Sequence, residues 1–400
     1  MHDLMDPVTI DLADPAFWQD PYPTLRRARA QHPHAHSTTG ELVVLSAQDF
    51  ETVHSSPAFG QPGLRALERL GVRDGPFYDW RALTMPVHDG PVHERLRSTV
   101  ARSFTPMRVQ RMRDELRAHA VATVATLRAR GSFDVVADYA DDLPLWLICR
   151  FLGLPLAARD EIATFLVGTE AGFTDPLTPE ARRRAEDGIV ALSEYVEHLV
   201  AERAAQPRED LVSDLLAAEA AGRLSRPELV ALVVNVLGGA VGSSRAAIAN
   251  SILLVLTHPE QAHWIRAAPD ERLGPAIEEC LRYHPPFRSG RKIVHEANDI
   301  LGVHLRAGET IFLARQAANR DPDRWDDPDR FDVTRRPERH FSFGYGPHFC
   351  LGQALARLDL HEALRAFLDE LPDARLVTQS PTRVPFTPDE QLDELVVTVR

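Results

Sequence analysis

One cysteine stands in a setting that suits metal chemistry. Cys350 lies in the segment Phe341-Ser-Phe-Gly-Tyr-Gly-Pro-His-Phe-Cys350-Leu-Gly, and a predicted helix begins at about the cysteine. Free backbone N–H groups and the positive end of a helix favour a thiolate over a thiol. Glycines let a backbone run close to a flat ligand, because they carry no Cβ. The segment indicates a thiolate beside a planar group, and the alternative is a buried structural cysteine in a glycine-rich turn.

The same segment resembles the haem-binding loop of the cytochrome P450 family. That loop carries Phe, two residues, Gly, three residues, Cys, one residue and Gly, and this chain has Phe343, Gly346, Cys350 and Gly352 at those positions. The resemblance implies haem b, iron protoporphyrin IX, bound through the Cys350 thiolate. An axial thiolate favours cleavage of the O–O bond of dioxygen.

A Glu, two residues, Arg pair lies on a predicted helix upstream of the cysteine. By spacing alone, Glu279 and Arg282 fit an ordinary surface ion pair, because residues three apart on a helix are neighbours. In the cytochrome P450 family a second arginine joins such a pair, and Arg335 matches it. The resemblance implies a structural triad that holds the irregular stretch before the thiolate loop.

Cationic side chains match the family's ligands for the haem propionates. His93 and Arg97 share one face of a predicted helix, because they are four residues apart. Cationic donors suit a carboxylate held in a site of low dielectric, and the alternative is a solvated charged helix face. The resemblance adds His348, two residues before the cysteine, and Arg291.

The assignment of Arg291 as a propionate ligand is open. The spacing between Arg291 and the next strand differs slightly from the family's pattern, so Lys292 or Arg288 is the alternative propionate ligand. Arg288 and Arg81 are also the two candidates to meet an anionic group on a substrate.

The long apolar helix departs from the family at its centre. Family members carry an acid and then a threonine there, and both help to deliver protons to oxygen. Alignment on Arg245 puts Gly242 in the acid's place and Ser243 in the threonine's place, so these are the candidate catalytic positions. We expect water or a polar group of the substrate to replace the carboxylate. The alternative is unusual chemistry: oxidative coupling, rearrangement or peroxygenase activity.

The segments that meet the substrate in this family are mostly apolar here. They contribute Phe77, Tyr78, Trp80, Leu83, Val236, Ala240, Pro286 and Phe287. Ordinary core packing is the alternative for each of them. The resemblance implies a monooxygenase that uses dioxygen to hydroxylate, demethylate or similarly oxidise a small, mostly apolar organic substrate.

The elements that must position these residues are mainly helical. Residues 229–256 are apolar enough to span a membrane, but Arg245 near the middle favours a helix buried inside a protein. Alternation and turn glycines predict a small sheet within 291–315, and 319–349 predicts a long irregular segment. We expect a mainly α protein with a small β region, the cytochrome P450 fold, in one large domain over residues 1–400.

Composition limits location and partners. The formal net charge of −13 argues against a nucleic-acid binder, because phosphate binding needs a basic surface. The 3 cysteines lack the spacing of a disulfide framework or a zinc site, which fits a reducing cytoplasm. The acidic start of the chain fits neither a signal peptide nor a membrane anchor. Resemblance to the soluble bacterial type implies electrons from a separate ferredoxin and ferredoxin reductase.

Overall fold

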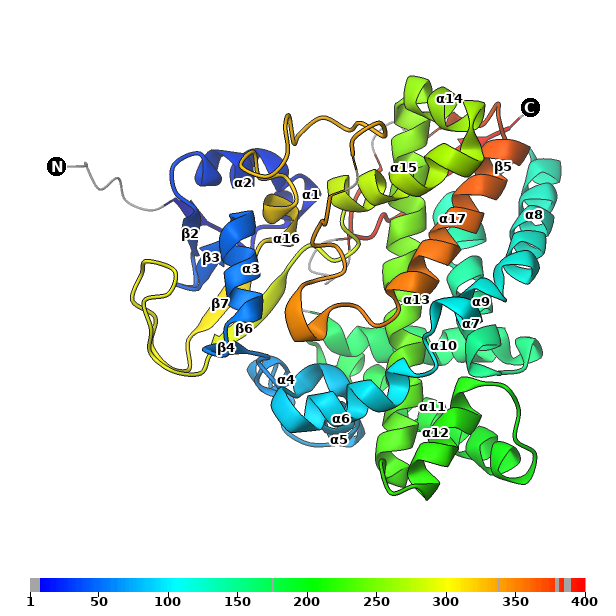
Figure 1. Cartoon of the computed structure of the whole chain (residues 1–400), viewed down its shortest axis with the longest axis horizontal. Coiled ribbons are helices and arrows are strands. Elements are labelled where there is room, and N and C mark those ends of the chain that lie inside the picture. The colour runs from blue at the N-terminus through cyan, green and yellow to red at the C-terminus, as the bar shows by residue number, and fades with distance from the viewer. Residues whose placement is uncertain (1–7, 175, 337, 378–380, 385–389, 400) are drawn as a thin grey trace. The chain divides into compact units, whose positions relative to one another are not determined.

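A computed structural model describes residues 8–174, 176–336, 338–377, 381–384 and 390–399. Contacts group the chain into two units, each assembled from segments far apart in the sequence. Unit 1 contains Met1–Pro62, Asn250–Cys350 and Thr378–Asp393, and unit 2 contains Gly63–Ala249, Leu351–Val377 and Glu394–Arg400. Helices dominate and the strands form two small sheets, which confirms the expected mainly α fold with a small β region (Figure 1).

Unit 1 is built on a six-stranded sheet in the order β1-β2-β3-β7-β6-β4. Its strands are β1 (Thr9–Ile10), β2 (His34–Ser37), β3 (Leu42–Val44), β4 (Phe59–Gly60), β6 (Gly290–Val294) and β7 (Thr310–Leu313). β3 pairs in parallel with β7, and the pairs β2–β3, β6–β7 and β4–β6 are antiparallel. The predicted sheet within 291–315 is therefore confirmed as the β6–β7 pair.

Side chains alternate across this sheet and feed two apolar clusters. Leu42 and Val44 pack with the buried Phe50 of α3 on one face, while Val43 packs with Trp18 of α1 on the other. Figure 1 shows α3 lying along the sheet. The helical elements of unit 1 are α1 (Pro15–Gln19), α2 (Tyr22–Arg29), α3 (Ala47–Ser55), α14 (Pro259–Ala267), α15 (Pro269–Tyr283), α16 (Arg315–Ala318) and the 3-10 turn η5 (Gly346–His348).

Unit 2 is mostly helical. Its helices are α4 (Arg65–Arg69), α5 (Pro76–Leu83), α6 (Gly90–Ala101), α7 (Pro106–Gln110), α8 (Arg113–Arg130), α9 (Asp142–Leu152), α10 (Arg159–Glu170), α11 (Pro179–Ala205), α12 (Leu211–Ala220) and α17 (Gln353–Glu370). Shorter turns are η1 (Met85–Val87), the π-helical η2 (Val136–Ala140), η3 (Leu156–Ala158) and η4 (Ala171–Phe173). An antiparallel sheet β5-β9-β8 joins β5 (Ser132–Asp134), β9 (Val396–Thr398) and β8 (Arg375–Leu376).

The long helix α13 (Arg226–Thr257) begins at a capping box. The Ser225 backbone N–H donates to the Glu228 carboxylate at 2.8 Å, and the Glu228 N–H donates to the Ser225 hydroxyl at 3.4 Å. Helix α13 is long and apolar enough to cross a membrane, but the core helix of a globular protein meets the same two criteria. Its Arg245 forms ion pairs with Asp141 at 2.9 Å and Glu170 at 3.5 Å, so it is anchored among protein groups as the sequence favoured.

Helix α17, the last helix of unit 2, carries a buried carboxyl group, that of Asp359, whose pKa is raised. Asp359 is 1% exposed, and its Oδ1 has no hydrogen-bond partner. Burial, aided by repulsion from Asp142, raises the pKa of Asp359 from 3.8 to about 8. The carboxyl group of Asp359 therefore stays protonated in the folded protein up to a pH of about 8, whereas in the unfolded chain it loses its proton near pH 3.8. As the pH rises from 3.8 to about 8, the unfolded state is favoured increasingly, and the contribution of Asp359 to the free energy of unfolding falls.

We predict that Asp359→Asn, a neutral replacement of similar shape, raises the melting temperature by roughly 2–5 °C at pH 8 and much less at pH 5. Thermal unfolding followed by circular dichroism at both pH values measures the difference. Asp373→Asn, at an exposed position of the same unit, is the control and should change neither. A gain for Asp359→Asn that is the same at both pH values would contradict the assignment.

Candidate functional site

Exposure separates Cys350 from the other two cysteines. Cys149 and Cys280 are buried, whereas Cys350 is partly exposed. Burial raises the pKa of the Cys149 and Cys280 thiols to about 12, so both stay protonated at neutral pH. Cys350 is therefore the cysteine that is accessible to a ligand.

The loop before Cys350 is held in a narrow turn. The Cys350 N–H donates to the Phe343 carbonyl at 2.8 Å. Gly346 has a φ of +68°, and a Cβ there would lie 2.5 Å from the His54 backbone oxygen. Glycine is thus needed at Gly346 both for backbone conformation and for space.

The helix after the cysteine begins later than the sequence predicted. α17 starts at Gln353 with Gly352 as its N-cap, whereas the prediction placed its start at about Cys350. The turn that closes the loop extends through Gly352, so Cys350 comes just before the first helical turn rather than within it.

This donor set fits haem better than a bare metal ion. Within the described ranges, no group of three or more His, Cys, Asp or Glu side chains is arranged to hold a metal. A single accessible cysteine would suit an iron whose other ligands come from a porphyrin. The residues present therefore fit a haem with one protein thiolate.

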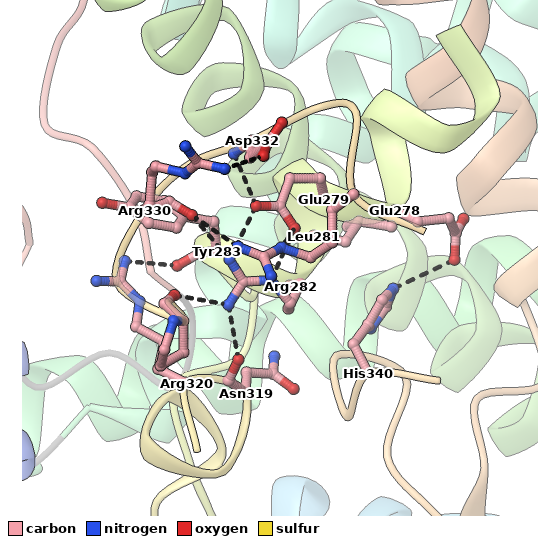
Figure 2. Close-up of polar contacts among 12 residues, drawn as sticks. Glu278, Glu279, Leu281, Arg282, Tyr283, Asn319, Arg320, Arg330, Asp332 and His340 are labelled. Atoms are coloured by element: carbon pink, nitrogen blue, oxygen red, sulfur yellow. Dashed lines mark hydrogen bonds and ion pairs between the residues drawn. The ribbon is translucent and has the colours of Figure 1, made fainter. Parts of the chain in front are cut away.

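A buried ion pair on α15 organises the stretch that leads to this loop (Figure 2). Arg282 contacts Glu279 through Nε–Oε2 at 2.7 Å and Nη2–Oε1 at 2.8 Å. The Arg335 Nε lies 3.5 Å from Glu279 Oε2, so the structure brings the three residues of the expected triad together. Arg282 also donates to the carbonyls of Asn319 and Pro328, each at 2.9 Å. The pair thereby satisfies backbone groups that no helix or strand satisfies.

Two polar side chains not singled out from the sequence connect this pair to the thiolate loop. The Asn319 Oδ1 accepts from the Phe341 N–H at 2.7 Å, and the Asn319 amide donates to Ser342 Oγ at 3.0 Å. Ser342 Oγ in turn donates to the Leu281 carbonyl on α15 at 2.6 Å. The segment Ala317-Ala-Asn-Arg-Asp-Pro322 could have pointed to Asn319, because it resembles the corresponding segment of the family. That resemblance alone assigns no role to the asparagine.

The alternation of side chains along β6 places Arg291 and Lys292 on opposite faces of the sheet. The Arg291 Nε donates to Glu41 Oε1 at 2.9 Å, and its guanidinium lies 5.2 Å from the Phe312 ring. Lys292 points to the opposite face, because side chains alternate along a strand. Its charge helps to lower the pKa of His54 to about 3, after the larger effect of burial, and His348 acts in the same direction. Lys292 and His348 thus both lie near His54, whose backbone contacts Gly346.

Unit 2 carries the other expected haem ligands and most of the long helix α13. His93 and Arg97 lie one turn apart on α6, with His93 2% exposed. On α13 the accessible positions Val236, Ala240 and Ser243 recur at helical spacing on one face. The Ser243 hydroxyl donates to the Gly239 carbonyl at 3.2 Å, and a Cβ at Gly239 would meet nothing within 4 Å. This face of α13 is therefore open and lined by small side chains, while Gly242 is buried.

The expected substrate-contacting residues divide into packed and accessible ones. Phe77 is 1% exposed and packs against Trp80 in a tilted contact and against Phe173 edge-to-face, with ring centroids 5.6 and 5.2 Å apart, so it belongs to the core. The Tyr78 hydroxyl donates to Glu68 at 3.1 Å. Leu83 is partly exposed.

The two candidates in unit 1 also differ from each other. Pro286 is buried, whereas Phe287 is 37% exposed and lies beside the Arg315 guanidinium, 5.9 Å from its ring centroid.

Comparison with known proteins gives consistent matches. The family profile described as Cytochrome P450 matches residues 170–372. The chain is 36% identical over 290 residues to cytochrome P450 107B1 of Saccharopolyspora erythraea, covering 72% of this chain and 70% of that protein. It is 32% identical over 373 residues to the vitamin D(3) 25-hydroxylase of Pseudonocardia autotrophica, covering 92% and 90% respectively. The crystal structure of CalO2 matches with a TM-score of 0.93 at 29% identity, covering 98% of this chain and 99% of that one.

The tight loop gives a prediction with a matched control. Gly346→Ala should lower both the melting temperature and the haem bound per protein, because the new Cβ meets the His54 carbonyl. Gly302→Ala is the control, since Gly302 also has a positive φ, +74°, but a Cβ there meets nothing within 4 Å. It should show only the backbone strain, about 1–2 kcal/mol. Equal losses of stability and haem in both variants would mean that the close approach at Gly346 is unimportant.

Proposed function

We propose, since this chain belongs to the cytochrome P450 family and is a haem-containing monooxygenase of that family, that Cys350 supplies the thiolate ligand of its iron. The observation that carries this assignment is that Cys350, in the family's four-position loop, is accessible while Cys149 and Cys280 are buried. When bound, the haem supplies the activation of dioxygen for insertion of an oxygen atom into an organic substrate.

The remaining residues of the loop and its surroundings hold the cofactor in place. The Phe343 carbonyl accepts a hydrogen bond from the Cys350 N–H, which fixes the backbone at the cysteine, while Gly346 and Gly352 would keep the backbone close to the ring. The free N–H groups at the start of α17, which follow Cys350 in the chain, would favour its thiolate form.

For the propionates we propose His93, Arg97, His348 and Lys292. Lys292 replaces Arg291, because Arg291 already forms an ion pair with Glu41 whereas Lys292 lies near His54 on the side of the thiolate loop. Charged donors of this kind stabilise carboxylates that are withdrawn from water.

Proton delivery at the distal helix would not use a side-chain acid at position 242. Gly242 has no side chain, and the Ser243 hydroxyl is a poor acid that donates to the Gly239 carbonyl. The hydroxyl oxygen remains able to accept, so it can position a water or a hydroxyl of the substrate. We therefore assign Ser243 to holding a proton donor, not to supplying the proton.

The glycine at position 242 also favours a second candidate function, in which no oxygen atom from dioxygen is inserted into the product. Without an acid at this position, the enzyme would be suited to oxidative coupling, rearrangement or a peroxide-driven oxidation. Turnover under labelled dioxygen decides between the two: label in the product supports oxygen insertion, and efficient turnover without label supports the alternative.

The wider setting follows the family. We propose a small, mostly apolar organic substrate, electrons from a separate ferredoxin and ferredoxin reductase, a cytoplasmic location and one catalytic domain over residues 1–400. In unit 2 the accessible face of α13 with Val236 and Ala240, and Leu83, would contact the substrate, and in unit 1 Phe287 is the accessible candidate. Phe77 instead packs in the core with Trp80 and Phe173.

We predict that the reduced protein with carbon monoxide shows the long-wavelength Soret band of thiolate ligation, and that Cys350→Ser abolishes it. Cys149→Ser and Cys280→Ser are the matched controls and should keep the band, since both thiols are buried. Retention of the band in Cys350→Ser would transfer the ligand role to another residue.

A further inference from the structure

Helix α5 of unit 2 carries a cation without a counter-charge. The contact that the structure gives the Arg81 guanidinium is the ring of Phe173, 5.4 Å from its centroid. In the part of the chain that the structure describes, no carboxylate pairs with it. Burial alone lowers the pKa of Arg81 to about 10, which still leaves the group charged at neutral pH.

Two other arginines of the same unit, one buried and one partly buried, are paired with carboxylates. Arg203, 1% exposed, contacts Asp210 at 2.5 Å and Glu202 at 2.8 Å. Arg245 contacts Asp141 and Glu170. This fold therefore compensates such charges where their role is structural, as the high cost of an uncompensated buried charge requires. Arg81, which is partly buried, has no such carboxylate partner among the described residues.

The residue before Arg81 adds a second donor. Trp80 is 8% exposed, and its indole Nε1 is buried with no hydrogen-bond partner. A buried donor that is left unpaired in the folded protein destabilises it, because the donor has lost its hydrogen bond to water. Through Phe77, whose ring contacts those of both Trp80 and Phe173, the two donors border one aromatic cluster.

The second cation that the sequence offered for an anionic substrate is engaged elsewhere. Arg288, in unit 1, donates to the carbonyls of Trp18 at 3.2 Å and Val384 at 3.4 Å. Its guanidinium satisfies backbone groups, whereas Arg81 has no such acceptor among the described residues.

We propose that Arg81 binds a carboxylate of the substrate, so that the substrate class is an apolar organic acid. A guanidinium matches a carboxylate with two parallel hydrogen bonds, and neighbouring aromatic rings suit an apolar body attached to it. The inference rests on the proposed function, because it specifies the substrate of the same site. It explains why the fold keeps two donors unpaired: the acceptor arrives with the ligand.

The test uses the haem-loaded protein and two fragments of nearly equal shape, benzoate and benzamide. Ligand-observed NMR titration should show benzoate binding about tenfold more tightly than benzamide. Arg81→Gln should remove this preference by weakening benzoate about tenfold and leaving benzamide unchanged, while Arg81→Lys keeps part of it.

The controls separate recognition from folding and from haem binding. Arg73→Gln removes an exposed cation shortly before α5 and should leave both affinities unchanged. The melting temperature of Arg81→Gln should not fall, because the change removes an uncompensated charge. The carbon monoxide band should persist in every variant, and its loss in the wild type would instead refute the proposed function.

Three outcomes would overturn the inference. In the wild type, equal binding of benzoate and benzamide, or binding of neither, would remove the preference for an acid. A preference that survives Arg81→Gln would assign the carboxylate to another group. A loss of haem from Arg81→Gln with the benzoate preference intact would assign Arg81 to a propionate.

Discussion

The contact between Arg282 and Glu279 is the constraint on which the rest of unit 1 depends. The stretch from Asn319 to the thiolate loop has almost no regular structure, so its backbone groups need partners from side chains. Arg282 supplies several of these partners, and Glu279 compensates its charge in a place where both are nearly inaccessible. Breaking a buried pair of this kind leaves an uncompensated charge and typically costs 3–5 kcal/mol.

The position of the cysteine depends on that contact through two short links. Asn319 and Ser342 connect the backbone around α15 to the start of the loop, and Phe343 then fixes the Cys350 amide. An irregular segment can thus be as well defined as a helix, provided that each polar group has one partner. The advantage over a helix is that the chain can pass close to a flat cofactor without side chains in the way.

The sequence was most informative where a local pattern determines local geometry. The spacing of Phe343, Gly346, Cys350 and Gly352, the capping box at Ser225 and the cytochrome P450 fold follow from such patterns, and the comparisons and structure bear out the fold. The sequence was least informative in strands, where a shift of one residue in the pairing register turns a side chain to the opposite face of the sheet. Arg291 and Lys292 are adjacent, but only the pairing of β6 with β7 shows which of them faces Glu41. The packing of Phe77 against Phe173 likewise depends on tertiary contacts that no single segment encodes.

The pairing of β3 with β7 determines when the sheet of unit 1 can form during synthesis on the ribosome. Residues 42–44 leave the ribosome early, but their parallel partners, 311–313, are made much later. At about 5–20 residues per second, β3 waits roughly 15–50 s with an apolar edge unpaired. During that time the edge is open to other nascent chains and to chaperones. The central sheet of unit 1 is therefore completed only late in synthesis, after most of the helices of unit 2 have already emerged.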